Sequence, residues 1–184
     1  MFEVVETLVL TLVIFLVIQN FVAQPYRVQQ MSMEHTLMPD QYVLVDKLTP
    51  RFDGYKRGDI IVFNPPPEWV QAQNEPFIKR VIGLGGDRIE IKNAHVYVNG
   101  VQLDEPYTYD GQPTTVSGDQ NSWVVPPGDL FVMGDHRENS ADSRVFGPIP
   151  LSSVIGRAWL RYWPIGTFGI LNTPTYPELR AATP

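Results

Sequence analysis

The sequence predicts a mainly β fold with a small inserted β lobe, preceded by one N-terminal transmembrane helix. Three observations support this prediction: a continuous apolar run near the N-terminus, short alternating apolar segments after it, and frequent turn residues. The chain has 184 residues, 43% of them hydrophobic, with 17 Pro and 14 Gly. Such spacing favours strands and turns over long helices. We expect residues 1–24 to form the anchor and 25–172 the β-rich domain, with an insertion at about 88–122, while 173–184 form a poorly ordered tail.

The apolar run covers residues 4–23, VVETLVLTLVIFLVIQNFVA, which is about the length of a membrane-spanning helix. Residues 8–18 carry no charge. Two other interpretations stay open: a helix buried in the core, and a cleaved signal peptide, which would want a basic start and small residues before its cut. The start Met-Phe-Glu and the bulky Phe21 favour a retained anchor. Charge counting leaves the orientation open, because long domains translocate largely regardless of flanking charges.

Strand character begins after the anchor. Residues 42–48 alternate apolar and polar, residues 59–63 follow a Gly-Asp turn, and residues 77–93 read as two strands around Gly-Gly-Asp. Asn99-Gly100 within residues 95–103 predicts a hairpin. Residues 104–122 are polar and read as a long loop or a small lobe. Strand character returns in 122–135 and 154–164.

Composition excludes several classes of function. The formal charge is −6, from 20 acidic and 14 basic side chains that form no basic run, so no nucleic-acid partner is expected. The absence of Cys removes disulfides, thiolate catalysis and Cys-ligated zinc. The sequence predicts no metal site and no cofactor.

Ser32 follows the apolar run closely and is flanked by two Met. A Ser hydroxyl becomes a nucleophile only when a neighbouring base takes its proton. Three His are candidates: His35 is only three residues away, His95 starts a hairpin, and His136 lies beside Asp135. A Ser-His-Asp triad therefore stays open.

Lys79 is the stronger candidate for the base. Its neighbours Phe77, Ile78 and Val81 are apolar, and burial lowers the pKa of an amine. A deprotonated Lys can then act as a general base near neutral pH. The alternative is a Lys on a solvated strand edge beside Arg80.

Four segments carry a family resemblance: SMEHTL at 32–37, RGDIIVF at 57–63, KRVIGLGGD at 79–87, and GDHRENSADSR at 134–144, followed by FGP at 146–148. In this order behind one apolar run, they resemble the motifs of bacterial type I signal peptidases, also called leader peptidases, which are membrane-anchored Ser-Lys endoproteases. The resemblance covers about residues 3–170 and implies a signal-peptidase-like β-fold.

The resemblance also implies roles for individual residues. Ser32 would be the acylating nucleophile, and Lys79 the base that activates it and later the deacylating water. Ser140 would hydrogen-bond the Lys79 amine, and Asp142 and Arg144 would form a supporting ion pair. The family holds the oxyanion with the nucleophile's backbone N–H and a side-chain hydroxyl two residues earlier. Here that position is Gln30, a longer side chain that can also donate.

Three positions depart from the family motifs. His35 and Gly85 each stand where the family has Pro, and His136 stands where it has Asn. Loss of the first Pro removes a ring that fixes the turn after Ser32. Gly85 either loosens its turn or permits positive φ. None of the three removes a catalytic group.

The substrate implied by the resemblance is the signal peptide of an exported preprotein, cut after an Ala-x-Ala-like site. Shallow pockets would accept the small side chains, formed by Tyr26, Val28, Met31, Leu37, Phe77 and Ile78, which can equally pack the core. The substrate would lie extended beside the strand that bears Lys79. The enzyme would be a single-pass protein of a bacterial cytoplasmic membrane, with its catalytic domain on the extracytoplasmic side and the bilayer as a partner.

Two other functions compete with this one. A related Ser-Lys self-cleaving protease would need a DNA-binding module where the apolar run lies. A membrane-tethered, inactive β domain would bind partners without catalysis.

Overall fold

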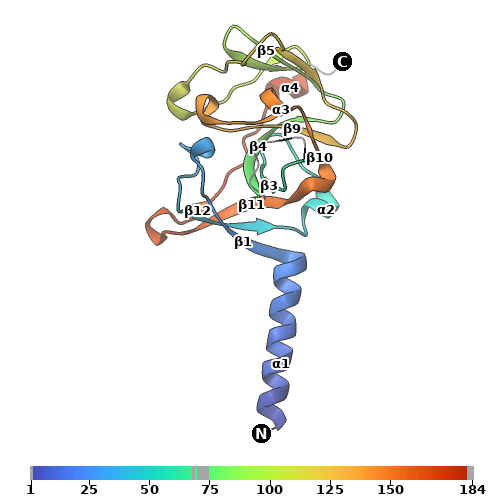
Figure 1. Ribbon diagram of the computed structural model, residues 1–184, viewed down its shortest axis with the longest axis vertical. Coiled ribbons are helices and arrows are strands. Elements are labelled where there is room, and N and C mark those ends of the chain that lie inside the picture. Colours follow the sequence, from blue (N-terminus) through green and yellow to red (C-terminus); the bar gives the residue numbers. More distant parts are fainter. Residues whose placement is uncertain (1, 68, 70–74, 182–184) are drawn as a thin grey trace.

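The computed structural model describes residues 2–67, 69 and 75–181. It has a mainly β body, a small second sheet and one N-terminal apolar helix. The predicted fold class is therefore confirmed. Figure 1 shows the helix projecting from one end of the body and the small sheet at the opposite end.

The N-terminal helix continues almost directly into the body. Helix α1 (Phe2–Val17) is followed by the π-helical turn η1 (Ile18–Val22) and then by strand β1 (Ala23–Arg27). The helical stretch Phe2–Val22 has a mean hydropathy of 2.2 and none of it is buried in the protein. Its length and composition are sufficient for it to cross a membrane.

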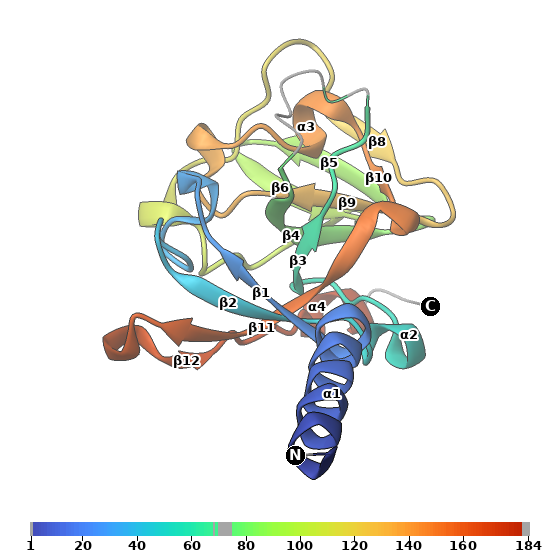
Figure 2. The same ribbon diagram turned by 60° about the horizontal axis from the view of Figure 1, so that its bottom comes forward.

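The main sheet is antiparallel and has the order β1-β2-β11-β3-β4-β9-β10, with β12 paired to β11. Figure 2 shows β1, β2 and β11 side by side at the end from which α1 leaves. The other strands of this sheet are β2 (Tyr42–Asp46), β3 (Ile60–Phe63), β4 (Phe77–Leu84), β9 (Asp129–Met133), β10 (Ile149–Pro150), β11 (Val154–Trp163) and β12 (Gly169–Ile170).

The centre of this sheet is buried on both faces. Alternate residues of β3 enter two different apolar clusters, with Ile60 and Val62 in one and Ile61 and Phe63 in the other. All four side chains are buried. A strand covered on both faces reads as a continuous apolar run, which is why IIVF does not alternate.

The lobe is a separate antiparallel sheet of order β7-β6-β5-β8, made of β5 (Arg88–Lys92), β6 (His95–Val98), β7 (Val101–Gln102) and β8 (Ser122–Val124). Asn99 and Gly100 both have positive φ, 52° and 83°, and form the predicted hairpin turn.

Short helices connect the strands. They are η2 (Met31–Met33), α2 (Pro50–Asp53), η3 (Tyr109–Gly111), η4 (Arg137–Asn139), α3 (Ser143–Phe146), η5 (Leu151–Ser153), η6 (Ile165–Thr167) and α4 (Pro177–Ala181).

The expectation of a poorly ordered tail from Thr173 is wrong for the part that the structure describes. Thr173 Oγ1 donates a hydrogen bond to Asp59 Oδ1 at 2.9 Å. Tyr176 is buried in the lobe core, with its hydroxyl 2.9 Å from that of Tyr107. The Pro content suggested disorder, whereas the aromatic ring supplies the apolar contact that holds this segment. Residues 182–184 lie outside the described range.

Candidate active site

A closed loop presents Ser32. Val28 N–H donates to Gln41 O, and Asp40 N–H donates to Val28 O, each at 2.8 Å, so the two ends of the loop are tied together. Ser32 lies in η2 within this loop and is 4% exposed. The following residue, Met33, is fully buried in the apolar cluster beneath and fixes the turn from below.

Lys79 reaches this turn from the middle of the main sheet. It lies on β4 opposite Ile61 of β3, and its Nζ is 2.6 Å from Ser32 Oγ. Nζ also contacts the Ile78 carbonyl at 3.2 Å. The two groups that the sequence picks out, 47 residues apart, are therefore in hydrogen-bond contact.

The electrostatic surroundings favour an uncharged Lys79. The side chain is 1% exposed, and desolvation by burial lowers its pKa to about 8. Asp142 and Asp135 act in the opposite direction, and Arg144 adds a smaller lowering effect. Desolvation dominates because no carboxylate forms an ion pair with Lys79 within the described chain.

The expected hydrogen bond between Ser140 and Lys79 is not formed in this structure. Ser140 Oγ instead donates to Asp142 Oδ2 at 2.7 Å. The carboxylate is the stronger acceptor for a hydroxyl, because a charged partner strengthens the bond. Ser140 nevertheless lines the same hollow as Ser32.

The expected ion pair between Asp142 and Arg144 is present. Arg144 donates through Nε to Asp142 Oδ1 and through a terminal nitrogen to Oδ2, both at 2.9 Å. Asp142 also accepts from the backbone N–H of Gly134 at 3.0 Å. These hydrogen bonds hold the pKa of Asp142 below its usual value despite its burial. The charge pair thus fixes both ends of the 134–144 loop.

Gly134 is required by close packing. A Cβ at this position would lie 2.3 Å from Ser140 Oγ and 2.5 Å from the Ser32 carbonyl oxygen. Any side chain would therefore push the Ser32 turn away from the loop that carries Ser140. This glycine opens the fourth motif, but its packing role was not predicted from the sequence.

A second buried ion pair, which the sequence analysis missed, lies on the other side of β4. Arg80 donates to both carboxylate oxygens of Asp135 at 2.8 and 2.7 Å, and Thr36 Oγ1 donates to Asp135 Oδ2 at 2.5 Å. The guanidinium also stacks 4.0 Å from the centre of the Tyr107 ring. The motif that contains Asp135 was the available signal, but its partners lie 55 and 99 residues away.

The Ser32 backbone N–H donates to no turn, loop or side-chain acceptor among the described residues. The Gln30 side chain is exposed and also makes no hydrogen bond within the described residues. It lines both hollows that flank Ser32. Gln30 therefore lies beside the Ser32 turn, and no hydrogen bond holds its amide there.

Two hollows adjoin the Ser32 turn. One of about 630 Å³ contains Ser32, Met31 and Ser140 in its lining. The other, of about 100 Å³, runs between residues 26–30 and 75–78. Of the six expected pocket residues, Tyr26, Val28, Phe77 and Ile78 line the smaller hollow and Met31 lines the larger. Leu37 does not fit the expectation, because it is fully buried in the core beneath the turn.

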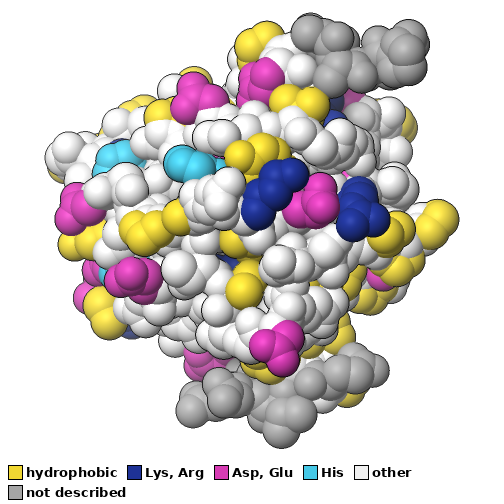
Figure 3. Space-filling model, turned by 90° about the horizontal axis from the view of Figure 1, so that it is seen from above, with side chains coloured by type: hydrophobic (Ala, Val, Ile, Leu, Met, Phe, Trp, Pro, Cys, Tyr) yellow, Lys and Arg dark blue, Asp and Glu magenta, His cyan; other side chains and the backbone are white. Residues whose placement is uncertain are grey.

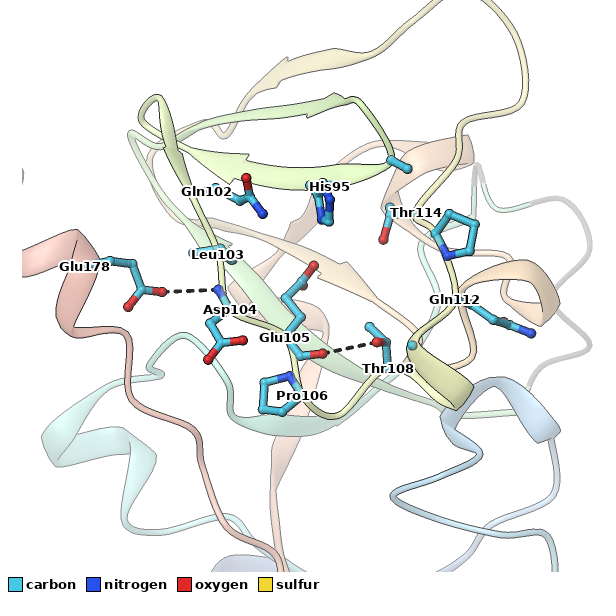
Figure 4. Close-up of a pocket in the computed structure, with 13 residues that line it drawn as sticks. His95, Gln102, Leu103, Asp104, Glu105, Pro106, Thr108, Gln112, Thr114 and Glu178 are labelled. Atoms are coloured by element: carbon cyan, nitrogen blue, oxygen red, sulfur yellow. Dashed lines mark hydrogen bonds between the residues drawn. The ribbon is translucent and has the colours of Figure 1, made fainter.

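A further hollow of about 680 Å³ lies on the lobe and contains neither member of the Ser32 and Lys79 pair. Figure 4 shows His95 and Glu105 in its lining. The Glu105 carboxylate is already paired with Arg137, at 2.6 and 3.0 Å. The Glu105 carboxylate therefore stabilises the fold through this ion pair, and we do not consider the lobe hollow a second candidate active site.

Two of the three departures from the family motifs, His35 and Gly85, lie in turns whose backbone angles bear on the change. His35 has φ of 82°, which Pro cannot adopt. Gly85 does not supply the positive φ, which falls instead at Gly86 (φ 93°) in the turn closed by Asp87 N–H and the Leu84 carbonyl. Gly85 is the second residue of this turn, and a Cβ there would lie only 3.0 Å from the Pro126 carbonyl oxygen.

A Ser-His-Asp triad is not assembled. His136 Nδ1 lies 2.7 Å from Glu34 Oε2 and His35 Nδ1 lies 3.2 Å from the Tyr107 carbonyl. Among the described residues, Ser32 Oγ has Lys79 as its side-chain partner and no histidine.

Comparison with known proteins gives a consistent result. The family model described as "Signal peptidase, peptidase S26" matches residues 1–163. A probable signal peptidase I-2 of Synechocystis sp. is 35% identical and the match covers 99% of this chain and 82% of that protein. A signal peptidase I of Leptolyngbya laminosa is 38% identical, covering 94% and 84% respectively.

A further relative and a solved structure also match this chain. Signal peptidase IB of Staphylococcus aureus is 33% identical over 90% of this chain and 91% of its own. A crystal structure of a signal peptidase I from Enterococcus faecalis is 33% identical, covers 56% of this chain and 95% of its own, and aligns with a TM-score of 0.45.

Proposed function

Because this chain belongs to the signal peptidase family, peptidase S26, and is a serine endopeptidase, we propose that it removes N-terminal signal peptides from exported preproteins with a Ser32–Lys79 dyad. The observation that carries the proposal is the 2.6 Å contact between Ser32 Oγ and the buried Lys79 amine. A neutral amine at this distance can accept the hydroxyl proton.

In the acylation step, Lys79 Nζ takes the proton of Ser32 Oγ while Oγ forms a bond to the scissile carbonyl carbon. The resulting ammonium returns that proton to the leaving amine as the peptide bond breaks. Lys79 is then neutral again and takes a proton from the water that attacks the Ser32 ester. It returns this proton to Ser32 Oγ as the ester bond breaks and the cleaved signal peptide leaves as the acid. Its lowered pKa keeps a useful fraction of the amine neutral at both stages.

The developing oxyanion would be held by the free Ser32 N–H, with Gln30 as a second, mobile donor. A lost oxyanion donor costs about 3 to 4 kcal/mol of transition-state stabilisation. The unrestrained Gln30 amide must therefore order around the substrate to contribute.

The substrate would bind as an extended strand along the open edge of β4. Strand β9 pairs with β4 only from Arg80 onward. On this side of β4, residues Phe77 to Lys79 therefore have no strand partner among the described residues. The hollow of about 100 Å³ between this edge and residues 26–30 suits Ala-like side chains and is too small for aromatic ones. Backbone pairing would supply affinity, and the hollow would supply specificity.

The bilayer is the second proposed partner. Exposed apolar side chains gather on β11, η6 and β12, at the end of the body from which α1 leaves (Figures 1 and 2): Trp159, Trp163, Ile165, Phe168 and Ile170. In contrast, the opposite end in Figure 3 shows charged side chains of both signs scattered among hydrophobic ones. The body would therefore sit against the lipid headgroups on the side of α1.

Anchoring would bring the enzyme and its membrane-inserted substrate into one plane and raise their effective concentration. We propose a single-pass protein of a bacterial cytoplasmic membrane, with the catalytic domain on the extracytoplasmic side, where signal peptides emerge.

The dyad is tested by cleavage of a preprotein in membranes containing the full chain. Ser32→Ala and Lys79→Ala should each lower the single-turnover rate by about a thousandfold or more. The matched controls are Ser152→Ala and Lys92→Ala, both at the surface and away from the site, and they should cleave normally. Retained cleavage by either dyad variant would overturn the proposal.

The cleavage-site preference is tested separately with the substrate. A preprotein with Ala at the first and third positions before the bond should be cut, whereas Phe at either position should prevent cleavage. Equal cleavage of the Ala and Phe substrates would contradict the role assigned to the small hollow.

A further inference from the structure

Glu34 and His136 form a side-chain pair directly beside the nucleophile. His136 Nδ1 lies 2.7 Å from Glu34 Oε2, and each side chain is 14% exposed. The imidazole also stacks on Tyr109, with ring centres 4.3 Å apart and planes 17° apart. The ring is thus fixed on one face and at one edge.

The same histidine holds Ser32 through its backbone. The His136 N–H donates to the Ser32 carbonyl oxygen at 3.0 Å. Glu34 in turn belongs to the nucleophile turn, since its N–H donates to the Met31 carbonyl at 3.0 Å. The side-chain pair and the backbone bond therefore close a ring that contains Ser32, Glu34 and His136.

The 134–144 loop has few alternative ways to hold this turn. Gly134 offers no side chain to grip it, and Asp135 binds Thr36 four residues further along. The Tyr109 N–H donates to the Asp135 carbonyl at 3.0 Å, which ties the lobe to the same loop. His136 is where the lobe, the loop and the nucleophile turn meet.

Resting on the proposed function, we propose that His136 and Glu34 are positioning residues, which together fix the orientation of Ser32 toward Lys79. An ionised carboxylate only accepts hydrogen bonds, so Nδ1 carries the proton in this contact. Neither side chain touches the reacting atoms. Their contribution is to restrict rotation of the Ser32 peptide, which directs both Oγ and the free N–H.

The test measures kcat and KM for preprotein cleavage by the full chain in proteoliposomes, together with the melting temperature. His136→Asn and Glu34→Gln should each lower kcat by about tenfold with KM nearly unchanged. The double variant should be no slower than the slower single variant, because both changes open the same ring. Melting temperatures should stay close to that of the unaltered enzyme.

The controls are His95→Asn and Glu90→Gln. His95 is exposed on the lobe and makes no side-chain hydrogen bond among the described residues, and Glu90 belongs to a surface ion-pair group there. Both variants should retain full kcat.

A pH profile separates positioning from proton transfer. In His136→Asn the limb set by Lys79 should stay at the same pH while the plateau falls. Disappearance of that limb would make His136 the base and overturn the inference.

Strictly additive losses in the double variant, an unchanged kcat in both single variants, or losses that follow the melting temperature would also overturn it. Failure of the Ser32→Ala and Lys79→Ala variants to lose activity would instead overturn the proposed function itself, so the two failures can be told apart.

Discussion

Two successive residues of β4, Lys79 and Arg80, place buried positive side chains on opposite faces of one strand. Arg80 is paired with both oxygens of Asp135, and this pairing raises its pKa against the effect of burial. Lys79 has a neutral hydroxyl as its main partner, and burial lowers its pKa to about 8. Equal burial therefore gives a permanent charge on one face and a titratable amine on the other.

The difference comes from the partner and not from the depth of burial. A buried charge is tolerated when a carboxylate compensates it, whereas burial without a compensating carboxylate lowers the pKa of an amine, so that it releases its proton more readily. The Arg137–Glu105 and Arg144–Asp142 pairs follow the Arg80 pattern. Around Ser32 and Lys79, the permanent charges hold the framework, while the Lys79 amine has a lowered pKa.

The largest effect on the cleavage rate is expected from replacing Lys79 with arginine, the residue type of the neighbouring Arg80. Lys79→Arg keeps a cation but cannot deprotonate, so the cleavage rate should fall by about a thousandfold or more. Single-turnover cleavage of a preprotein measures this, with Lys92→Arg on the lobe as the control. Substantial activity in Lys79→Arg would show that proton transfer does not depend on position 79.

Removing the negative charge that compensates Arg80, on the other face of β4, should lower the stability of the folded protein. Asp135→Asn leaves the buried Arg80 guanidinium without its counter-charge, and we expect a loss of about 3 to 5 kcal/mol in the free energy of unfolding. Urea unfolding of the detergent-solubilised chain measures it. Asp40→Asn, at the exposed Arg27–Asp40 pair, should leave the midpoint unchanged. Equal losses in both variants would contradict the contrast between buried and exposed pairs.

Lys79→Met should abolish cleavage and stabilise the fold. The Lys79 pKa falls from 10.5 to about 8 on folding, so between about pH 8 and 10.5 the unfolded chain binds a proton that the folded chain lacks. Stability of the unaltered protein should therefore rise with pH between about 8 and 10.5. At pH 7 the Met variant should be more stable by up to about 3 kcal/mol, and the gap should narrow above pH 8. Unfolding curves at pH 7 and 10 test this, and a gap that does not depend on pH would contradict it.

The smallest effect is the pH dependence of the reaction itself. With a pKa of about 8, the neutral fraction of Lys79 rises about tenfold between pH 7 and 9, and the acylation rate should rise with it. Rapid-quench measurement of acylation from pH 6 to 9.5 gives the profile. A rate that stays flat across this range would contradict the role of Lys79 as base.

Local sequence patterns predicted much of the fold. The Asn99-Gly100 hairpin, the turn before β5 and the apolar run of β3 follow from short-range rules. Ser32 and Lys79 could also be predicted from the sequence, because both lie within recognisable motifs. The contact itself joins positions 47 residues apart, and only the folded sheet brings them together.

The sequence does not predict which of several possible partners a side chain contacts in the folded protein. Ser140 binds Asp142 and not Lys79, Leu37 packs the core and not a pocket, and Tyr176 docks a tail that its prolines suggested was loose. Each outcome depends on distant surfaces whose positions no local pattern encodes. The same holds for Arg80, whose apolar-flanked position fits either a solvated edge or a buried ion pair.

The connection between helix α1 and strand β1 contains no flexible linker. Val22 already accepts a hydrogen bond from Lys47, and Ala23 is in register with Asp46. A spanning helix leans when the hydrocarbon layer is thinner than its own apolar length. Because the connection between α1 and β1 is rigid, a tilt of the helix would tilt the whole β domain by the same angle. Bilayer thickness would therefore set the orientation in which the substrate peptide reaches the site.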